Sequence, residues 1–346
     1  MLGQERAKLL LTAAFAPDRL GHAYLFTGPA GVGKTLLAQE AAQALLCCGD
    51  GARPCGVCRE CRLFAHDAHP DFLLLQPEGD SRVIKIEKIR DLIHTLSLMP
   101  VQGNRRVAIL READALQEAA ANALLKTLEE PPAFALLILT SSRPSALLPT
   151  LRSRCQEIRF ASLSAEHVRA ILEGQPGLDE EDVAAAVRLA GGSADRALQL
   201  IESGCLEIRR KTLARILALP AEEVFEVADD VLDWAKAAST QYEPQRERLR
   251  AFLYMLDSTY RDIMVCAVSG AKEPVQQPAA PNEVEGGGPD AAQRLPPRRL
   301  LSIHEALWDA RRQIDANATI DLVLQDLFER ISRLQRVAPS EVEGAA

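Results

Sequence analysis

A glycine-rich octapeptide carries the clearest chemistry in the sequence. Starting at Gly28, it reads Gly-Pro-Ala-Gly-Val-Gly-Lys-Thr and fits the phosphate-binding pattern G-x-x-x-x-G-K-[ST] at every position. Its glycines let backbone N–H groups turn towards phosphate oxygens, the lysine adds a positive charge, and the threonine hydroxyl can bind Mg²⁺. The residues concerned are Gly28, Gly31, Gly33, Lys34 and Thr35. The pattern predicts a site for ATP or ADP with Mg²⁺, against the plainer alternative of a chance glycine-rich turn.

Hydrolysis of a bound nucleotide needs a second strand that ends in acidic residues, because one carboxylate holds Mg²⁺ and another orients the attacking water. The apolar run at 107–110 continues as Arg111, Glu112, Ala113 and Asp114. Arg111 stands where the metal-binding aspartate is expected, and a cation there weakens Mg²⁺ binding. We therefore expect the chain's own ATPase activity to be weak or absent. The alternative is that Glu112, the candidate catalytic carboxylate, or Asp114 restores the site.

A cluster of cysteines indicates a metal site. Cys55, Cys58 and Cys61 are separated by two residues each, and Cys47 and Cys48 lie just upstream, so four thiolates can converge. Four sulfur ligands in a chain without signs of an oxidising compartment favour a closed, structural Zn²⁺ site. We prefer Cys47 to Cys48 as the fourth ligand. An iron–sulfur cluster and unligated thiols are the alternatives.

One arginine is placed where it can act outside its own domain. Arg154 lies in the segment Ser153-Arg154-Cys155, which a proline-containing loop separates from the apolar run at 135–141. An arginine in that position can project from the domain edge into the nucleotide site of an adjacent subunit, as an arginine finger does. The alternative is a surface arginine paired with a carboxylate, which spacing alone favours.

The elements that position these residues change character along the chain. Short apolar runs alternate with helical patterns over the first 160 residues, which is typical of an α/β layer, and helical patterns alone follow. Strands are expected at 23–27, 72–76, 106–110 and 135–141. Helices are expected at 35–46, 86–98, 112–129, 164–173, 179–190, 193–202, 206–217, 221–239, 247–269, 299–316 and 320–336.

The pattern divides the chain into an α/β domain and two helical domains. The α/β domain is expected at 1–160, with the cysteine module inserted at 47–61. Three short helices follow at 161–204, and a longer helical bundle occupies 205–336. Within the bundle, a proline- and glycine-rich stretch at 271–298 is expected to be a flexible insertion, because it cannot bury enough apolar surface to become ordered. The last residues, 337–346, are expected to be a frayed tail.

Composition excludes several classes of protein. The chain has 346 residues, 47% of them hydrophobic, and its 40 Lys and Arg against 48 Asp and Glu give a net charge of −8. The hydrophobic fraction excludes a chain that is disordered throughout. The negative net charge excludes a surface that attracts nucleic acid over its whole area. No uncharged apolar run approaches the roughly 20 residues of a membrane span. The sparse cysteines and the nucleotide motif favour a cytoplasmic location.

These motifs together resemble a known family. The phosphate loop, the cysteine cluster, His69-Pro70-Asp71, the run from Ala119 to Pro132 and Ser153-Arg154-Cys155 are similar to the AAA+ clamp-loader subunits of bacterial DNA polymerase III. The resemblance covers essentially the whole chain. It implies a RecA-like AAA+ domain that carries a zinc module, followed by a three-helix lid and a collar domain that joins the subunits into a ring.

The resemblance also implies roles for particular residues. Arg154 would be the finger given to a neighbouring ATPase subunit, and Ser142 would occupy the sensor-1 position. The motif that supplies the sensor-2 arginine in active subunits has Asp195 in its fourth place, with Arg196 one step on. The implied partners are gamma/tau and delta subunits, the sliding clamp and primer–template DNA in the nucleoid-associated replisome. A catalytically active gamma/tau-like ATPase is the alternative.

Overall fold

The computed structural model describes two compact units. The described residues are 2–15, 20–77, 83–173, 178–237, 245–269, 295–316 and 318–336. One unit comprises Met1–His167 with Ser193–Asp195, and the other comprises Val168–Gly192 with Arg196–Ala346. Most of the expected insertion at 271–298 and the whole of the tail at 337–346 lie outside the described residues. The division of the helical part at residue 204 stays a prediction.

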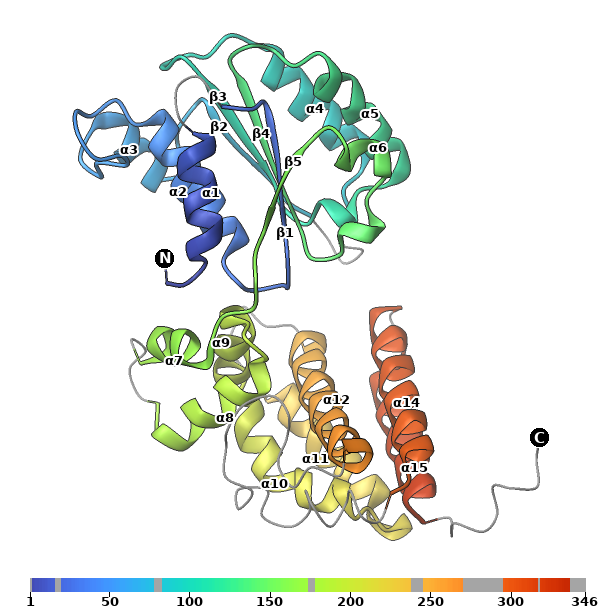
Figure 1. The fold of residues 1–346 in the computed structure, drawn as a ribbon. Coiled ribbons are helices and arrows are strands. Elements are labelled where there is room, and N and C mark those ends of the chain that lie inside the picture. Colours follow the sequence, from blue (N-terminus) through green and yellow to red (C-terminus); the bar gives the residue numbers. More distant parts are fainter. Residues whose placement is uncertain are drawn as a thin grey trace. The chain divides into compact units, whose positions relative to one another are not determined.

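The first unit is a three-layer α/β domain built on a five-stranded sheet whose paired strands are all parallel (Figure 1). The strand order is β2-β3-β4-β1-β5. The strands are β1 (Ala23–Thr27), β2 (Phe72–Leu75), β3 (Arg106–Leu110), β4 (Ala135–Ser141) and β5 (Gln156–Arg159). Every residue of β1, β3 and β4 is buried. Such continuous burial is what helices on both faces of a parallel sheet produce.

Alternate residues of the strands pack against helices on opposite faces of the sheet. Tyr24 and Phe26 of β1 lie in one core with α1 and α2, whereas Leu25 lies in the other with α4, α5 and α6. Figure 1 shows these two groups of helices on either side of the strands. The helices of this unit are α1 (Glu5–Ala14), α2 (Lys34–Leu46), α3 (Arg59–Ala65), α4 (Ile86–Ser97), η1 (Ala113–Ala115), α5 (Glu118–Glu129), η2 (Pro144–Ala146) and α6 (Pro149–Arg152).

Several local expectations differ from the structure, and helices α1 and α3, for example, were not expected. The helix expected from residue 112 begins only at Glu118, because Glu112 adopts a left-handed conformation (φ 49°) and a single 3₁₀ turn, η1, follows it. The strand β5 was not expected at all. Of its four residues only Ile158 is buried, so neither an apolar run nor an alternation marks it in the sequence.

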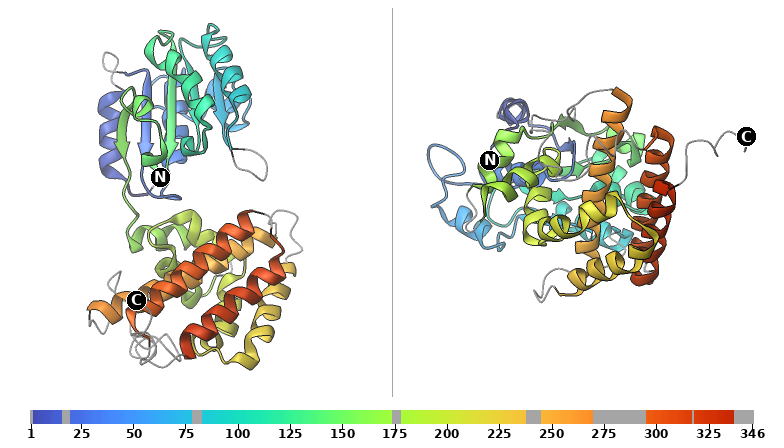
Figure 2. Two further views of the ribbon diagram at one scale, coloured as in Figure 1. Left: turned by 90° about the vertical axis from the view of Figure 1, so that its right-hand side faces the viewer. Right: turned by 90° about the horizontal axis from the view of Figure 1, so that it is seen from below.

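The second unit consists of helices. They are α7 (Ala165–Leu172), which begins in the first unit, α8 (Glu180–Ala190), α9 (Ala194–Glu202), α10 (Cys205–Leu217), η3 (Ala221–Glu223), α11 (Val224–Lys236), α12 (Gln245–Ser269), α14 (Pro297–Asp315) and α15 (Ile320–Arg336). Helix α8 shows how the sequence sets the boundaries: the Asp179 side chain accepts from the Asp182 N–H at its start, and left-handed Gly191 ends it. Helices α14 and α15, at the red end of the colour scale, pack side by side (Figures 1 and 2). Among the described helices, none has a stretch that is both long and apolar enough to cross a membrane.

A buried ion pair between Asp71 and Arg106 stabilises the first unit. The carboxylate of Asp71 is fully buried and accepts hydrogen bonds from the backbone of Val101 (2.7 Å) and Gln102 (2.8 Å) and from the guanidinium of Arg106 (3.0 Å). Burial by itself raises the pKa of Asp71, but these hydrogen bonds outweigh it and leave the pKa below its ordinary value. The ionised carboxylate therefore stabilises the loop that precedes β3.

We expect Asp71→Ala to lower the free energy of unfolding by about 3 kcal/mol, because it leaves the buried Arg106 guanidinium without its anion. Because the folded-state pKa of Asp71 is depressed, this contribution is complete above pH of about 4 and is lost as the pH falls through the folded-state pKa. Urea unfolding followed by circular dichroism measures the change. Asp91→Ala on the exposed face of α4 is the matched control; equal stability of the two variants would contradict the assignment.

Candidate functional site

The sheet topology brings three of the predicted site segments to one edge. Strands β3, β4 and β1 are neighbours and run parallel, so the residues that follow them emerge at the same, carboxyl-terminal edge. These are the phosphate loop after β1, the turn at 111–114 after β3, and Ser142 after β4. Ligands of open parallel sheets bind at this edge.

The phosphate loop has the backbone that its sequence predicts. Gly28, Gly31 and Gly33 have φ values of 142°, 70° and 91°, and α2 begins at Lys34. Positive φ at glycine lets successive N–H groups form a concave nest for phosphate oxygens, so the loop fits a nucleotide. Lys34 is only 8% exposed, and its ammonium donates to the carbonyl groups of Gly28 (2.8 Å) and Pro29. Burial lowers the pKa of Lys34 to about 8, although nearby carboxylates oppose the shift.

The residues after β3 differ from the usual arrangement of an ATPase, in which one carboxylate holds Mg²⁺ and another orients the attacking water. Arg111 donates to the side-chain oxygen of Gln76 (2.9 Å) at the end of β2. The left-handed turn at Glu112 places its backbone N–H on the Thr140 hydroxyl (3.2 Å). The carboxylate that reaches the end of β4 is that of Asp114.

Asp114 is the centre of a hydrogen-bond network that sequence reasoning missed. Its carboxylate accepts from the Ser141 hydroxyl (2.8 Å), from the Ser142 N–H (3.2 Å) and from the Arg143 guanidinium (3.1 Å). Burial opposes ionisation, but the hydrogen bonds together leave the pKa of Asp114 below its ordinary value. The structure therefore brings the predicted Ser142 to this network through its backbone, and the side-chain hydroxyl comes from the neighbouring Ser141.

The start of α9 lies directly against the phosphate loop. The N–H groups of Ala194 (2.9 Å) and Asp195 (3.4 Å) donate to the carbonyl of Gly31. A Cβ added at Gly31 would lie 2.1 Å from the Ser193 hydroxyl oxygen, so only glycine fits at this point of contact. Asp195 itself is exposed, whereas Arg196 donates to the Tyr254 hydroxyl (2.8 Å). Spacing alone gave no sign of this contact, because 164 residues separate Gly31 from Asp195.

Arg154 lies just after α6 and is paired within the chain. Its guanidinium donates to the Thr150 carbonyl (2.9 Å) and to the carboxylate of Glu129 at the end of α5 (2.6 Å). The side chains of Arg154 and Glu129 are 35% and 48% exposed, so water screens the ion pair. Glu129 is a partner that the sequence analysis did not identify.

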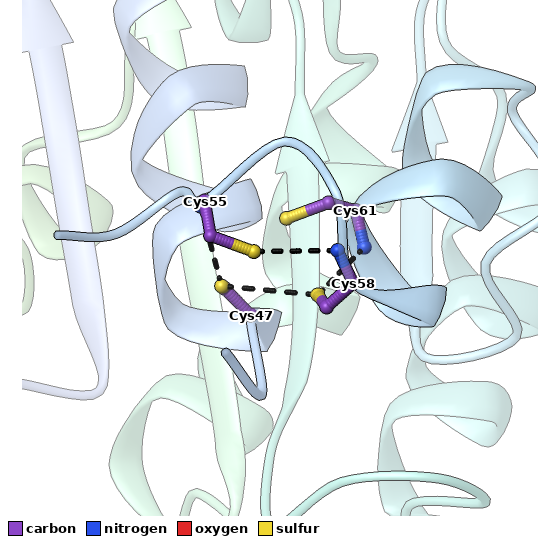
Figure 3. Close-up of side chains that lie close together, drawn as sticks. All are labelled: Cys47, Cys55, Cys58 and Cys61. Carbon is purple, nitrogen blue, oxygen red and sulfur yellow. Dashed lines mark hydrogen bonds between the residues drawn. The ribbon is translucent and has the colours of Figure 1, made fainter. Parts of the chain in front are cut away.

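Four cysteines converge beside α2 and α3 (Figure 3). Cys47 follows α2, Cys55 lies in the intervening loop, and Cys58 and Cys61 lie at the start of α3. Their sulfur atoms all lie within 4.8 Å of one another, and those of Cys47 and Cys58 are 3.9 Å apart. Sulfur atoms of a tetrahedral site with bonds of about 2.3 Å are about 3.8 Å apart, so the cluster fits a metal. Cys48 is exposed and is not among the four.

Backbone groups prepare the sulfur atoms for a metal. The N–H groups of Cys55, Cys58 and Cys61 donate to the sulfur atoms of Cys47 (3.4 Å), Cys55 (3.3 Å) and Cys58 (3.4 Å), respectively. The hydrogen bond from Cys61 is the main reason why the pKa of Cys58 is lowered to about 5. Between these ligands, Glu60 pairs with buried His69 (3.0 Å), which links α3 to the segment before β2. The donor set can therefore hold a structural metal such as zinc.

Comparisons with known proteins give the family. A family model described as DNA polymerase III, delta subunit matches residues 3–164. The chain is 30% identical to DNA polymerase III subunit delta' of Escherichia coli K12 over 324 residues, which cover 93% of this chain and 92% of that one. It is 38% identical to subunit delta' of Pseudomonas aeruginosa over 208 residues, 59% of this chain and 62% of that one.

The similarity to the tau subunit is more limited in extent. The chain is 34% identical to DNA polymerase III subunit tau of Salmonella typhimurium over 246 residues, which cover 67% of this chain and 38% of the relative. The match to the Pseudomonas relative also spans less than two thirds of that protein, whereas the match to the Escherichia coli delta' subunit is nearly complete. The parallel five-stranded α/β domain, the helical domain that follows it and this near-complete match lead to one conclusion. The chain belongs to the delta' subunits of DNA polymerase III, within the clamp-loader family.

Proposed function

We propose that the chain supports ATP-dependent loading of a sliding clamp onto primed DNA by giving Arg154 to the ATP site of a neighbouring subunit. The observation that carries this proposal is the place of Arg154 at the domain surface, held by an exposed ion pair. Such a pair contributes about 0 to 1 kcal/mol, so the guanidinium can exchange Glu129 for a phosphate at little cost. A planar, permanently charged fork suits the charge that develops on a transferred phosphoryl group.

Membership of the family supports a proposal about the partners. We propose that gamma/tau and delta subunits assemble with this chain in the cytoplasm, and that the clamp and primer–template DNA are engaged through the complex. The net charge of −8 agrees with DNA contacts that are shared among subunits. The proposal is tested by substituting Arg154 in the assembled complex and measuring both assembly and ATP turnover on the same sample.

We propose that the chain's own nucleotide site binds ATP or ADP but hydrolyses ATP inefficiently. The loop N–H groups at Gly28, Gly31 and Gly33 and the Lys34 ammonium would hold the phosphates, and Thr35 would face Mg²⁺. A bound Mg²⁺ would neutralise phosphate charge. The chain lacks an aspartate at position 111 to hold that ion, and three hydrogen-bond donors already occupy Asp114. Glu112 and Ser142 are the residues that we propose to face the terminal phosphate.

A gamma/tau-like ATPase is the second candidate, and the intact phosphate loop favours it. We expect the isolated chain to hydrolyse ATP no faster than its Lys34→Ala variant does. The reason is that the acidic strand end is incomplete and Arg154 serves another subunit. Phosphate release by the two proteins, with folding checked by circular dichroism, measures this. Turnover by the isolated chain that Lys34→Ala abolishes would favour the second candidate.

We propose that the metal held by the four cysteines is Zn²⁺ and that its role is structural. A complete set of four sulfur ligands leaves no position open for a water molecule. The ion would join the end of α2 to the start of α3. Its chemistry is thus to fix the module at 47–61, and no catalytic step passes through it.

A further inference from the structure

Asp195 lies beside the phosphate loop, and the proposed function gives its carboxylate no role. Asp195 is the second residue of α9, and its backbone N–H donates to the carbonyl of Gly31 (3.4 Å). A Cβ at Gly31 would lie 2.9 Å from the Cβ of Asp195, so the aspartate side chain starts at the rim of the phosphate loop. Asp195 is exposed to solvent.

The surroundings of Lys34 are rich in negative charge. The carboxylates of Asp114, Asp195 and Glu112 all act on the Lys34 ammonium, and each favours its charged form. Lysine of a phosphate loop is the group that reaches the β- and γ-phosphates. The γ-phosphate of a nucleoside triphosphate bound here would therefore have to share the Lys34 ammonium with these carboxylates.

We propose that Asp195 makes the phosphate loop select nucleoside diphosphates over nucleoside triphosphates. The inference rests on the proposed binding of nucleotide at this loop. The α- and β-phosphates of a diphosphate can use the N–H groups of the loop, which do not depend on Asp195. The γ-phosphate adds negative charge on the side of Lys34, where the carboxylate of Asp195 repels it.

Asp114 and Asp195 differ in how their charge is balanced. Asp114 accepts hydrogen bonds from Ser141, Ser142 and Arg143, so its charge is partly balanced by fixed donors. Asp195 is the carboxylate whose backbone contacts the loop itself. Substituting Asp195 therefore changes the charge at the rim and leaves the network of β3 and β4 intact.

The test is competitive displacement of a fluorescent ADP analogue from the purified full chain by ADP and by ATP, each with Mg²⁺ and again with EDTA. We expect the wild-type chain to bind ADP at least about tenfold more tightly than ATP. A tenfold ratio of affinities requires only a modest difference in electrostatic free energy. Asp195→Asn is expected to reduce this ratio at least about fivefold, chiefly by strengthening ATP binding. Glu202→Gln, which removes one charge from the far end of α9, is the matched control and is expected to leave the ratio unchanged.

Three results would overturn the inference. They are equal affinity of the wild-type chain for ADP and ATP, an unchanged ratio in Asp195→Asn, and a lack of binding of either nucleotide. The first two results overturn only the selectivity and leave the proposed nucleotide binding intact, whereas a lack of binding overturns both; none of the three bears on the role of Arg154. The role of Arg154 is measured on the assembled complex, whereas the ratio of affinities is measured on the isolated chain.

Discussion

Replacing Arg154 with alanine is expected to lower ATP turnover at the site that it completes by about 10³-fold or more, and to leave the complex assembled. Arginine fingers contribute about 10³ to 10⁵ in rate because the guanidinium balances charge that develops on the phosphoryl group in the transition state. Assembly is expected to survive because Arg154 is partly exposed and its ion pair with Glu129 contributes little to stability. Clamp- and DNA-stimulated ATPase of the reconstituted loader measures the effect.

Two further substitutions separate a finger from a surface arginine. Arg152→Ala removes a neighbouring exposed arginine of α6 and is expected to leave turnover unchanged. Arg154→Lys keeps the charge and loses the planar fork, so it is expected to restore only a small part of the activity. Full activity of the Arg154→Ala complex would contradict the finger role. Loss of assembly in that variant would assign the residue to an interface.

Removing the metal is expected to have the second large effect. Zinc bound by small cysteine-containing domains contributes apparent free energies of about 10 to 16 kcal/mol, which are also folding free energies of the residues that it orders. We expect about one zinc ion per chain. Cys58→Ser is expected to lose the ion, because Cys58 lies within the cluster and caps α3. Elemental analysis and thermal unfolding with and without a chelator give the two readouts.

The neighbouring cysteine provides the control for this prediction. Cys48 adjoins Cys47 in the sequence, yet it is exposed and stands outside the set of four. Cys48→Ser is therefore expected to retain the ion and the unfolding temperature of the wild-type chain. Iron in place of zinc, or loss of metal from Cys48→Ser with retention in Cys47→Ser, would show that the ligand set is wrong.

Much of the sheet could be predicted because its strands are buried on both faces. The apolar runs at β1, β3 and β4 mark those strands to the residue, since parallel strands covered by helices are apolar throughout. The edge strand β5 carries charged residues and could not be recognised in this way. The split between η1 and α5 depends on the left-handed turn at Glu112, which helical periodicity does not encode.

The candidate sites show the same division between local and distant information. The phosphate loop and the cysteine cluster each lie in a short segment, so spacing predicts their residues, whereas the structure selects the preferred Cys47 over Cys48. The partners that tune them come from elsewhere in the chain. Glu129 reaches Arg154, and Asp195 reaches the loop, through packing that spacing does not reveal.

The amount of ATP hydrolysed in the first turnover of the assembled loader shows whether Arg154 acts on the nucleotide of a neighbouring subunit. One chain gives one guanidinium to one neighbouring site, so a loader with Arg154→Ala is expected to hydrolyse about one ATP fewer per complex in the pre-steady-state burst. The nucleotide bound at the affected site should remain unhydrolysed. A burst of unchanged size, from complexes shown to contain the variant chain, would contradict the claim that Arg154 acts on a neighbour's nucleotide.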